Sequence, residues 1–100
     1  MAEYSNDDFG VSFSIPDKLT IRQQLRFRSE SAFSSNADKL ERFWFGAQEL
    51  IQDWECERIP NPREVDFATE TDPKIVDVIN YVASVTAGHM MRLGYIEKND

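Results

Sequence analysis

Residues 72–95 read DPKIVDVINYVASVTAGHMMRLGY and contain the most regular apolar spacing in the chain. Asp72 and Pro73 are typical of a helix start, because the carboxylate can cap free N–H groups and proline there loses no hydrogen bond. Gly94 is typical of a helix end, since glycine readily adopts the left-handed conformation. We therefore expect a helix over about 73–93. Its main apolar ridge, spaced by three and four, consists of Ile75, Ile79, Val82, Thr86 and Met90 or Leu93.

Residues 36–57, NADKLERFWFGAQELIQDWECE, carry a second apolar pattern. Spacings of three and four recur here as well, which is typical of one face of a helix. The residues of this face are Leu40, Phe43, Trp44, Ala47, Leu50, Ile51 and Trp54. Pro60 and Pro62 follow and stop a helix, because proline disfavours the helical conformation of the residue before it. The pattern predicts a middle helix over about 37–56.

The segment TIRQQLRFRSE, which begins at Thr20, predicts a first helix over about 20–30. Thr20 and Gln23 have the spacing of a capping box, in which each side chain bonds the backbone N–H of the other residue. The apolar stripe of this helix is narrow and consists of Ile21, Leu25 and Phe27.

Residues 9–15, FGVSFSI, alternate between apolar side chains and glycine or serine. Alternation at period two is typical of a half-buried strand. A short strand is not stable alone, and no second strand is obvious in the chain, so we expect an extended arm over 1–15. Together, these patterns predict a mainly α fold: one domain over 1–100, built as a small three-helix bundle with an extended N-terminal arm or short strand.

The composition excludes several classes of protein. The chain has 100 residues, 41% of them hydrophobic, and a formal charge of −7, which disfavours binding to nucleic acid phosphates. One cysteine excludes an internal disulfide. The first residues lack the cationic start and apolar core of a signal peptide, and no apolar run approaches the roughly 20 residues of a membrane span. We expect a soluble cytoplasmic protein that binds neither nucleic acid nor membrane.

The residues able to carry chemistry are few. The chain has one histidine, His89, and one cysteine, Cys56, and it lacks the closely spaced ligand pairs of metal sites. A nucleophilic pair of Cys56 and His89 is conceivable, since such pairs meet in space. We favour a histidine at a helix edge, bonded to a carbonyl or water. Asp53, Glu55 and Glu57 alternate, and we interpret them as a solvated face rather than as paired catalytic carboxylates. We therefore expect no enzyme activity, metal or cofactor.

Three stretches carry a family resemblance: IPDKLTIRQQLRF, RFWFGAQELIQDWECERIP and TDPKIVDVINYVASVTAGHMMRLGYIEKN. The recurring residues are Arg22, Gln23, Gln24 and Leu25; Trp54, Glu55 and Cys56; Asp72 and Pro73; His89 and Met90; and Lys98 and Asn99. Over about residues 14–99, the chain resembles small proteins of tailed bacteriophages that are encoded among the tail genes and commonly labelled tail assembly chaperones.

The resemblance implies a non-enzymatic factor of phage tail morphogenesis in the cytoplasm of the infected bacterial host. The role ascribed to such chaperones is to coat the hydrophobic helices of the tape-measure protein until tail-tube subunits replace them. The implied partners are therefore tail proteins. Two other functions also fit a small acidic protein. One is a phage-encoded inhibitor of a bacterial defence system, which would need a row of carboxylates. The other is a structural connector or tail-completion protein that stays in the virion.

The candidate partner-binding residues are Phe9, Phe13, Arg22 and Arg26. An unpaired strand edge in the arm would expose backbone groups that another chain can complete. The two arginines belong to the only basic zone of an otherwise acidic chain, TIRQQLRFR. We therefore expect a surface either for self-association through complementary charge or for docking a partner strand. The alternative is that the arm packs on its own helices and the arginines pair internally.

Overall fold

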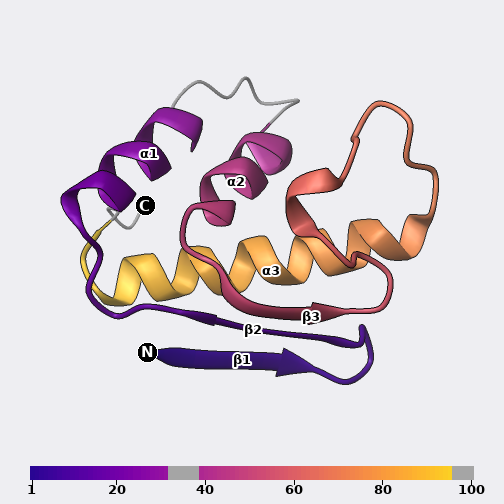
Figure 1. Ribbon diagram of the computed structural model, residues 1–100, viewed down its shortest axis with the longest axis horizontal. Coiled ribbons are helices and arrows are strands. Elements are labelled where there is room, and N and C mark those ends of the chain that lie inside the picture. Colours follow the sequence, from indigo (N-terminus) through magenta and orange to yellow (C-terminus); the bar gives the residue numbers. More distant parts are fainter. Residues whose placement is uncertain (32–38, 96–100) are drawn as a thin grey trace.

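The computed structural model describes residues 1–31 and 39–95 and shows a three-stranded antiparallel sheet with helices on one side (Figure 1). In chain order the elements are β1 (Ala2–Asn6), β2 (Val11–Ile15), α1 (Ile21–Ser31), α2 (Lys39–Gln48), β3 (Gln52–Cys56), the 3-10 helix η1 (Pro62–Glu64) and α3 (Pro73–Arg92). The expected mainly α three-helix bundle is therefore wrong, and the fold is mixed α/β. The difference arises because two segments expected to be arm and helix form strands instead.

The strand β2 lies at the centre of the sheet, with β1 on one side and β3 on the other. Tyr4 of β1 is opposite Phe13, and Cys56 of β3 is opposite Val11. Val11, Phe13 and Ile15 are buried, as the period-two pattern predicted. The expectation that this strand has no partner in the chain is wrong, since both of its edges are paired internally.

The N-terminal segment over 1–15 is a β-hairpin rather than an extended arm. Its turn spans residues 7–10, and the side-chain oxygen of Asn6 accepts hydrogen bonds of 3.0 and 3.3 Å from two backbone N–H groups there. Gly10 closes the turn with a φ of +64°, which glycine adopts without strain. The first strand was missed because Tyr4 is its only large apolar side chain, so its alternation is weak.

Residues 37–56 do not form the single helix that we expected. The helix α2 ends at Gln48, and after a turn the chain continues as β3. Asp53 has a φ of +54°, and the register against β2 is irregular at this point. A strand prevails here because it pairs the second edge of β2, whose backbone groups would otherwise lack partners. It also places Trp54 against Phe13, with ring centroids 5.9 Å apart.

The ends of the other two helices follow the predicted signals. The backbone N–H of Thr20 donates to the side chain of Gln23 at 2.9 Å, and the backbone N–H of Gln23 donates to the hydroxyl of Thr20 at 3.1 Å. The capping box is therefore confirmed. Asp72 caps α3 by accepting from a backbone N–H at 3.0 Å, with Pro73 as the first helical residue. Gly94 has a φ of +80° just beyond the helix, as expected for a terminator.

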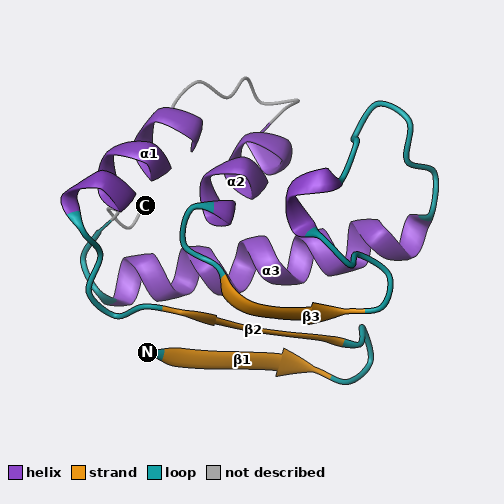
Figure 2. Cartoon of the chain, viewed as in Figure 1, coloured by secondary structure: helices purple, strands orange, loops and turns teal. Residues whose placement is uncertain are grey.

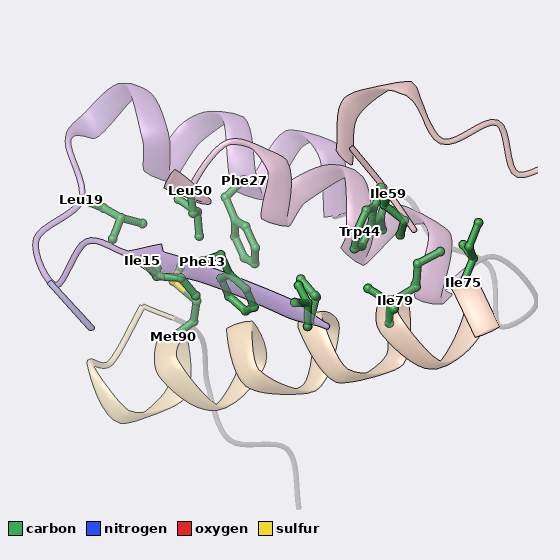
Figure 3. Packing of buried hydrophobic residues seen from close by; sticks show 13 residues of the cluster. Phe13, Ile15, Leu19, Phe27, Trp44, Leu50, Ile59, Ile75, Ile79 and Met90 are labelled. Carbon is green, nitrogen blue, oxygen red and sulfur yellow. The ribbon is translucent and has the colours of Figure 1, made fainter. Parts of the chain in front are cut away.

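The hydrophobic core lies between the inner face of the sheet, α3 and the α1–α2 pair, as the elements in Figure 2 and the side chains in Figure 3 show. The predicted ridge of α3 is buried: Ile75, Ile79, Val82, Thr86 and Met90. Phe27 of α1 meets Phe43 of α2 edge-on, with ring centroids 5.6 Å apart. Trp44 is fully buried, and its indole N–H donates to the carbonyl of Pro62 at 3.2 Å. This packing fixes which faces of α1 and α3 remain exposed.

Candidate functional site

His89 lies in the last turns of α3 and is only 1% exposed. Its Nε2 is 3.0 Å from the carbonyl oxygen of Pro16, which only accepts, so Nε2 carries the proton and donates. The guanidinium of Arg92, which only donates, lies 3.3 Å from Nδ1, so Nδ1 accepts and the hydroxyl of Tyr4 donates to it at 2.8 Å. The expected carbonyl-bonded histidine is confirmed. Both ring nitrogens serve to join α3 to the hairpin.

Further polar groups surround this histidine. Arg92 donates to the hydroxyl of Tyr4 at 3.1 Å. The carboxylate of Asp17 is 3.8 Å from Nε2 of His89 and 2.8 Å from the N-terminal ammonium. The hydrogen bond from that ammonium lowers the pKa of Asp17, and the charge of Arg92 acts in the same direction. We call Tyr4, Asp17, His89 and Arg92, with the N-terminal ammonium, the polar clasp. Its geometry ties the hairpin to the end of α3 and is structural.

Cys56 is remote from the polar clasp. It is half-buried on β3, opposite Val11 at one end of β2, whereas His89 bonds to Pro16 beyond the other end. Five residues of strand span about 16 Å at roughly 3.3 Å per residue. Cys56 and His89 therefore do not form a nucleophilic pair. Within residues 1–31 and 39–95, no group of three or more His, Cys, Asp and Glu side chains is arranged to hold a metal ion.

The structure separates the four candidate partner-binding residues. Phe13 is 3% exposed and belongs to the core. Phe9 is half-buried beside Tyr81, with ring centroids 5.9 Å apart. Arg22 and Arg26 are exposed on α1, at the opposite end of the molecule from the hairpin turn that holds Phe9 (Figure 1). The two phenylalanines and the two arginines therefore do not form one surface.

The exposed side of α1 combines apolar and cationic side chains. Ile21 is 70% exposed and Leu25 is 61% exposed, whereas Phe27, the third residue of the predicted apolar stripe, is buried. Arg26 is 3.5 Å from the carboxylate of Glu49, whereas Arg22 makes no ion pair with any described residue. We call Ile21, Arg22, Leu25 and Arg26 the α1 surface. In the sequence, the α1 surface is indicated by Arg22 and Arg26, which are one helical turn apart and lie on the same side of the helix as Ile21 and Leu25.

A groove of about 250 Å³ opens on the other side of α2. It is lined by three segments: Leu40 and Glu41 of α2; Val65, Phe67, Glu70 and Asp72 of the connector; and Ile75, Val76 and Ile79 of α3. We call it the α2–α3 groove. Val76 is 51% exposed within the groove. The ring of Phe67 packs against the ring of Phe45, with centroids 5.8 Å apart. Periodicity within one element does not reveal this site because its walls come from three separate segments.

The outer face of the sheet is polar. A hollow of about 450 Å³ lies over it, lined in part by Glu3, Ser5, Ser12, Asp53 and Glu55. The hydroxyl of Ser14 donates to the carboxylate of Asp53 at 2.8 Å. Asp53 and Glu55 therefore lie on the outer side of β3, which agrees with the interpretation of this acidic run as a solvated face.

Comparison with protein-family models, with curated proteins and with solved structures finds no match. Among the described residues, no helix is both long and apolar enough to cross a membrane. The α1 surface and the α2–α3 groove each expose apolar side chains beside charged groups of one sign, and both are therefore candidate binding sites.

Proposed function

We propose that the protein is a non-enzymatic adaptor or chaperone of bacteriophage tail morphogenesis that binds a tail protein through the α1 surface. The observation that supports this proposal is the exposure of Ile21 and Leu25, one helical turn apart, beside Arg22 and Arg26. Single exposed apolar residues are ordinary. A pair on one preformed helix face, flanked by cations, matches the way helices recognise other helices.

The energetics of the α1 surface favour an apolar helical partner. Burying an isoleucine or leucine side chain contributes about 1.5–3 kcal/mol. Because α1 is already folded and capped, little conformational entropy is lost when Ile21 and Leu25 are covered. The guanidinium group of arginine binds a carboxylate through two parallel hydrogen bonds, so Arg22 and Arg26 favour a partner segment that also carries Asp or Glu. The partner is thus an amphipathic helix with an acidic flank.

The resemblance to tail assembly chaperones names the tape-measure protein as this partner, since its long hydrophobic helices need cover before the tail tube forms. An adaptor of this kind acts by contact alone, which accords with the structural role of His89 and with the separation of His89 from Cys56. A structural connector of the virion would also present such a surface. The two functions differ in whether the protein remains in purified particles.

The test is capture of the tape-measure protein encoded by the same phage, co-expressed with the full chain. Leu25→Asp should reduce capture about tenfold, because it places a carboxylate where apolar contact and an acidic partner are expected. Met91→Asp is the matched control, since Met91 is 39% exposed on α3 and outside the α1 surface. Equal capture by both variants would overturn the proposal. Mass spectrometry of purified virions separates the two roles: a chaperone is absent and a connector is present.

A further inference from the structure

The α2–α3 groove has the size of a side-chain receptor rather than of a ligand pocket. Its volume of about 250 Å³ is below the roughly 300–1,000 Å³ of small-molecule sites. Its floor is aliphatic and aromatic, formed by Leu40, Phe67 and Ile79 among others. Val76 remains half in solvent at its side. A groove of this kind suits one or two aliphatic side chains from a docked helix.

The rim of the α2–α3 groove is acidic. Glu41, Glu70 and Asp72 all border it. Arg58, 3.4 Å from Asp72, partly neutralises its charge. One carboxylate oxygen of Glu70 accepts hydrogen bonds from two backbone N–H groups. Glu41 makes no ion pair with any residue that the structure describes. The rim therefore favours a cationic occupant.

We propose that the α2–α3 groove receives the α1 surface of a second copy of this chain. Ile21 and Leu25 enter the apolar floor, and Arg22 lies beside Glu41. The argument is charge complementarity joined to apolar fit. The α1 surface lies in the basic zone of a chain with a formal charge of −7, and the groove is apolar with an acidic rim. In this contact the apolar side chains of both surfaces are covered, and the cationic surface meets the acidic rim.

The contact cannot close within one chain. Phe27 packs α1 against Phe43 of α2, and Ile21, Arg22 and Leu25 lie on the other side of α1. Arg26, at the edge of the α1 surface, reaches Glu49 just beyond the end of α2. The groove is lined by the connector together with α2 and α3. Figure 1 shows the connector and α1 on opposite sides of α2. Surface and groove are therefore different patches on opposite sides of the molecule. A contact between two different patches is head-to-tail and builds open chains or rings rather than a closed two-fold dimer.

Self-association would regulate the proposed function. Only this regulatory role rests on the proposed function; the self-association itself does not. Self-association covers Ile21 and Leu25 until a tail protein competes for them. A groove of about 250 Å³ takes only one or two side chains, so we expect the association to be weak and reversible. Its ionic part weakens with salt, since the Debye length is about 10 Å at 0.1 M ionic strength.

The test is sedimentation velocity of the full chain over a wide range of protein concentration. We expect reversible association that weakens about tenfold in Arg22→Glu and in Glu41→Arg, and that returns when both changes are combined in one chain. Lys18→Glu, at an exposed position outside both surfaces, is the control and should associate normally. A chain that stays monomeric at the highest concentration, or a double variant that is not restored, overturns the inference.

A mixing experiment tests the head-to-tail geometry. Leu25→Asp blocks the α1 surface and leaves the groove intact, whereas Val76→Asp blocks the groove and leaves the α1 surface intact. Each variant alone should be monomeric. Their mixture should form a dimer that grows no further, because only one productive contact remains. A mixture that stays monomeric while the unchanged chain associates overturns the inference. Val76→Asp should still capture the tail protein, so failure of self-association and failure of the proposed function are distinguishable.

Discussion

The hydroxyl of Tyr4 donates a hydrogen bond of 2.8 Å to Nδ1 of His89, across 85 positions of the chain. It joins the first strand to the last helix at a point where both are packed on the core. The same imidazole donates from Nε2 to the carbonyl of Pro16, so one side chain ties α3 to β1 and to the end of β2. The only histidine of the chain is therefore a structural crosslink.

Tyr4→Phe keeps the ring and removes the hydroxyl, and with it the part-buried hydrogen bond to His89 and the exposed one from Arg92. We expect the free energy of unfolding to fall by about 1 kcal/mol, the usual net contribution of the part-buried bond. His89→Gln should cost more, about 2–3 kcal/mol, because it removes both bonds and a buried ring. Urea unfolding measures both changes. Capture of the tail protein by the folded variants should be unchanged, and a loss of capture without a loss of stability would contradict a structural role.

The polar clasp predicts that the free energy of unfolding depends on pH through protonation of Asp17. Its pKa in the folded protein lies below the ordinary value of 3.8, chiefly because the N-terminal ammonium bonds the carboxylate. The stabilising contribution is therefore complete above the unfolded pKa and is lost as pH falls through the lowered folded pKa. Asp17→Asn lacks this contribution. The difference in urea midpoint between the unchanged chain and the variant should shrink between about pH 5 and pH 2. A difference that does not vary with pH would contradict the assignment.

The ridge of α3 predicts large effects of truncation. Ile79 and Val82 are both buried in the core. Ile79→Ala should cost about 2–4 kcal/mol and Val82→Ala about 1–3 kcal/mol, through lost burial and the cavity left behind. Val76→Ala, on the half-exposed side of the same helix, is the control and should cost less than about 0.5 kcal/mol. Similar effects at all three positions would mean that the wrong face of α3 has been assigned to the core.

We expect that replacing Thr86 with valine stabilises the protein. The hydroxyl of Thr86 is buried and, within the described part of the chain, has no hydrogen-bond partner. A buried polar group without a partner costs about 1–3 kcal/mol. Valine has nearly the same shape, so Thr86→Val should raise the free energy of unfolding by about 1 kcal/mol. Val85→Thr, at the neighbouring half-buried position, provides a reverse control that should not stabilise. A lower urea midpoint for Thr86→Val would show that the hydroxyl has a partner after all.

The regular parts of the fold were predictable because their signals are local. The capping box of α1, the Asp72–Pro73 start of α3 and its Gly94 end each depend on a few neighbouring residues. The ridge of α3 was predictable from its period alone. The third strand was not, because its apolar residues continue the helical spacing of α2 up to Trp54. The alternation of Asp53, Glu55 and Glu57 was visible, yet it fits a strand only once β2 offers an edge to pair.

The candidate site was predictable in part. Arg22 and Arg26 were identified from charge alone and are exposed on α1. Phe13 was assigned to the same surface because its strand lacked a visible partner, and the pairing with β1 and β3 places it in the core. Exposure of Ile21 and Leu25 could not be predicted, since it depends on α1 packing against α2 through Phe27 on the other side of the helix. The α2–α3 groove depends on tertiary structure throughout.

The hairpin provides the last prediction. Deleting residues 1–14 removes β1 and most of β2, including Val11 and Phe13 of the core. It also removes Tyr4, the partner of His89, and leaves β3 with no strand to pair. An isolated strand is not stable in water, and the loss of two buried side chains adds several kcal/mol. We therefore expect the truncated chain to lose its cooperative unfolding transition.

Circular dichroism and tryptophan fluorescence measure this loss, because Trp54 packs against Phe13 and Trp44 packs against Trp54. The charge reversal of Arg22 and Arg26 to Glu is the matched comparison. Both residues are exposed, so that variant should unfold close to the unchanged midpoint, although Arg26 gives up its ion pair with Glu49. If the truncated chain instead retained a cooperative transition and native fluorescence, the N-terminal segment would be a separable arm, and the sheet would not be the base on which the helices pack.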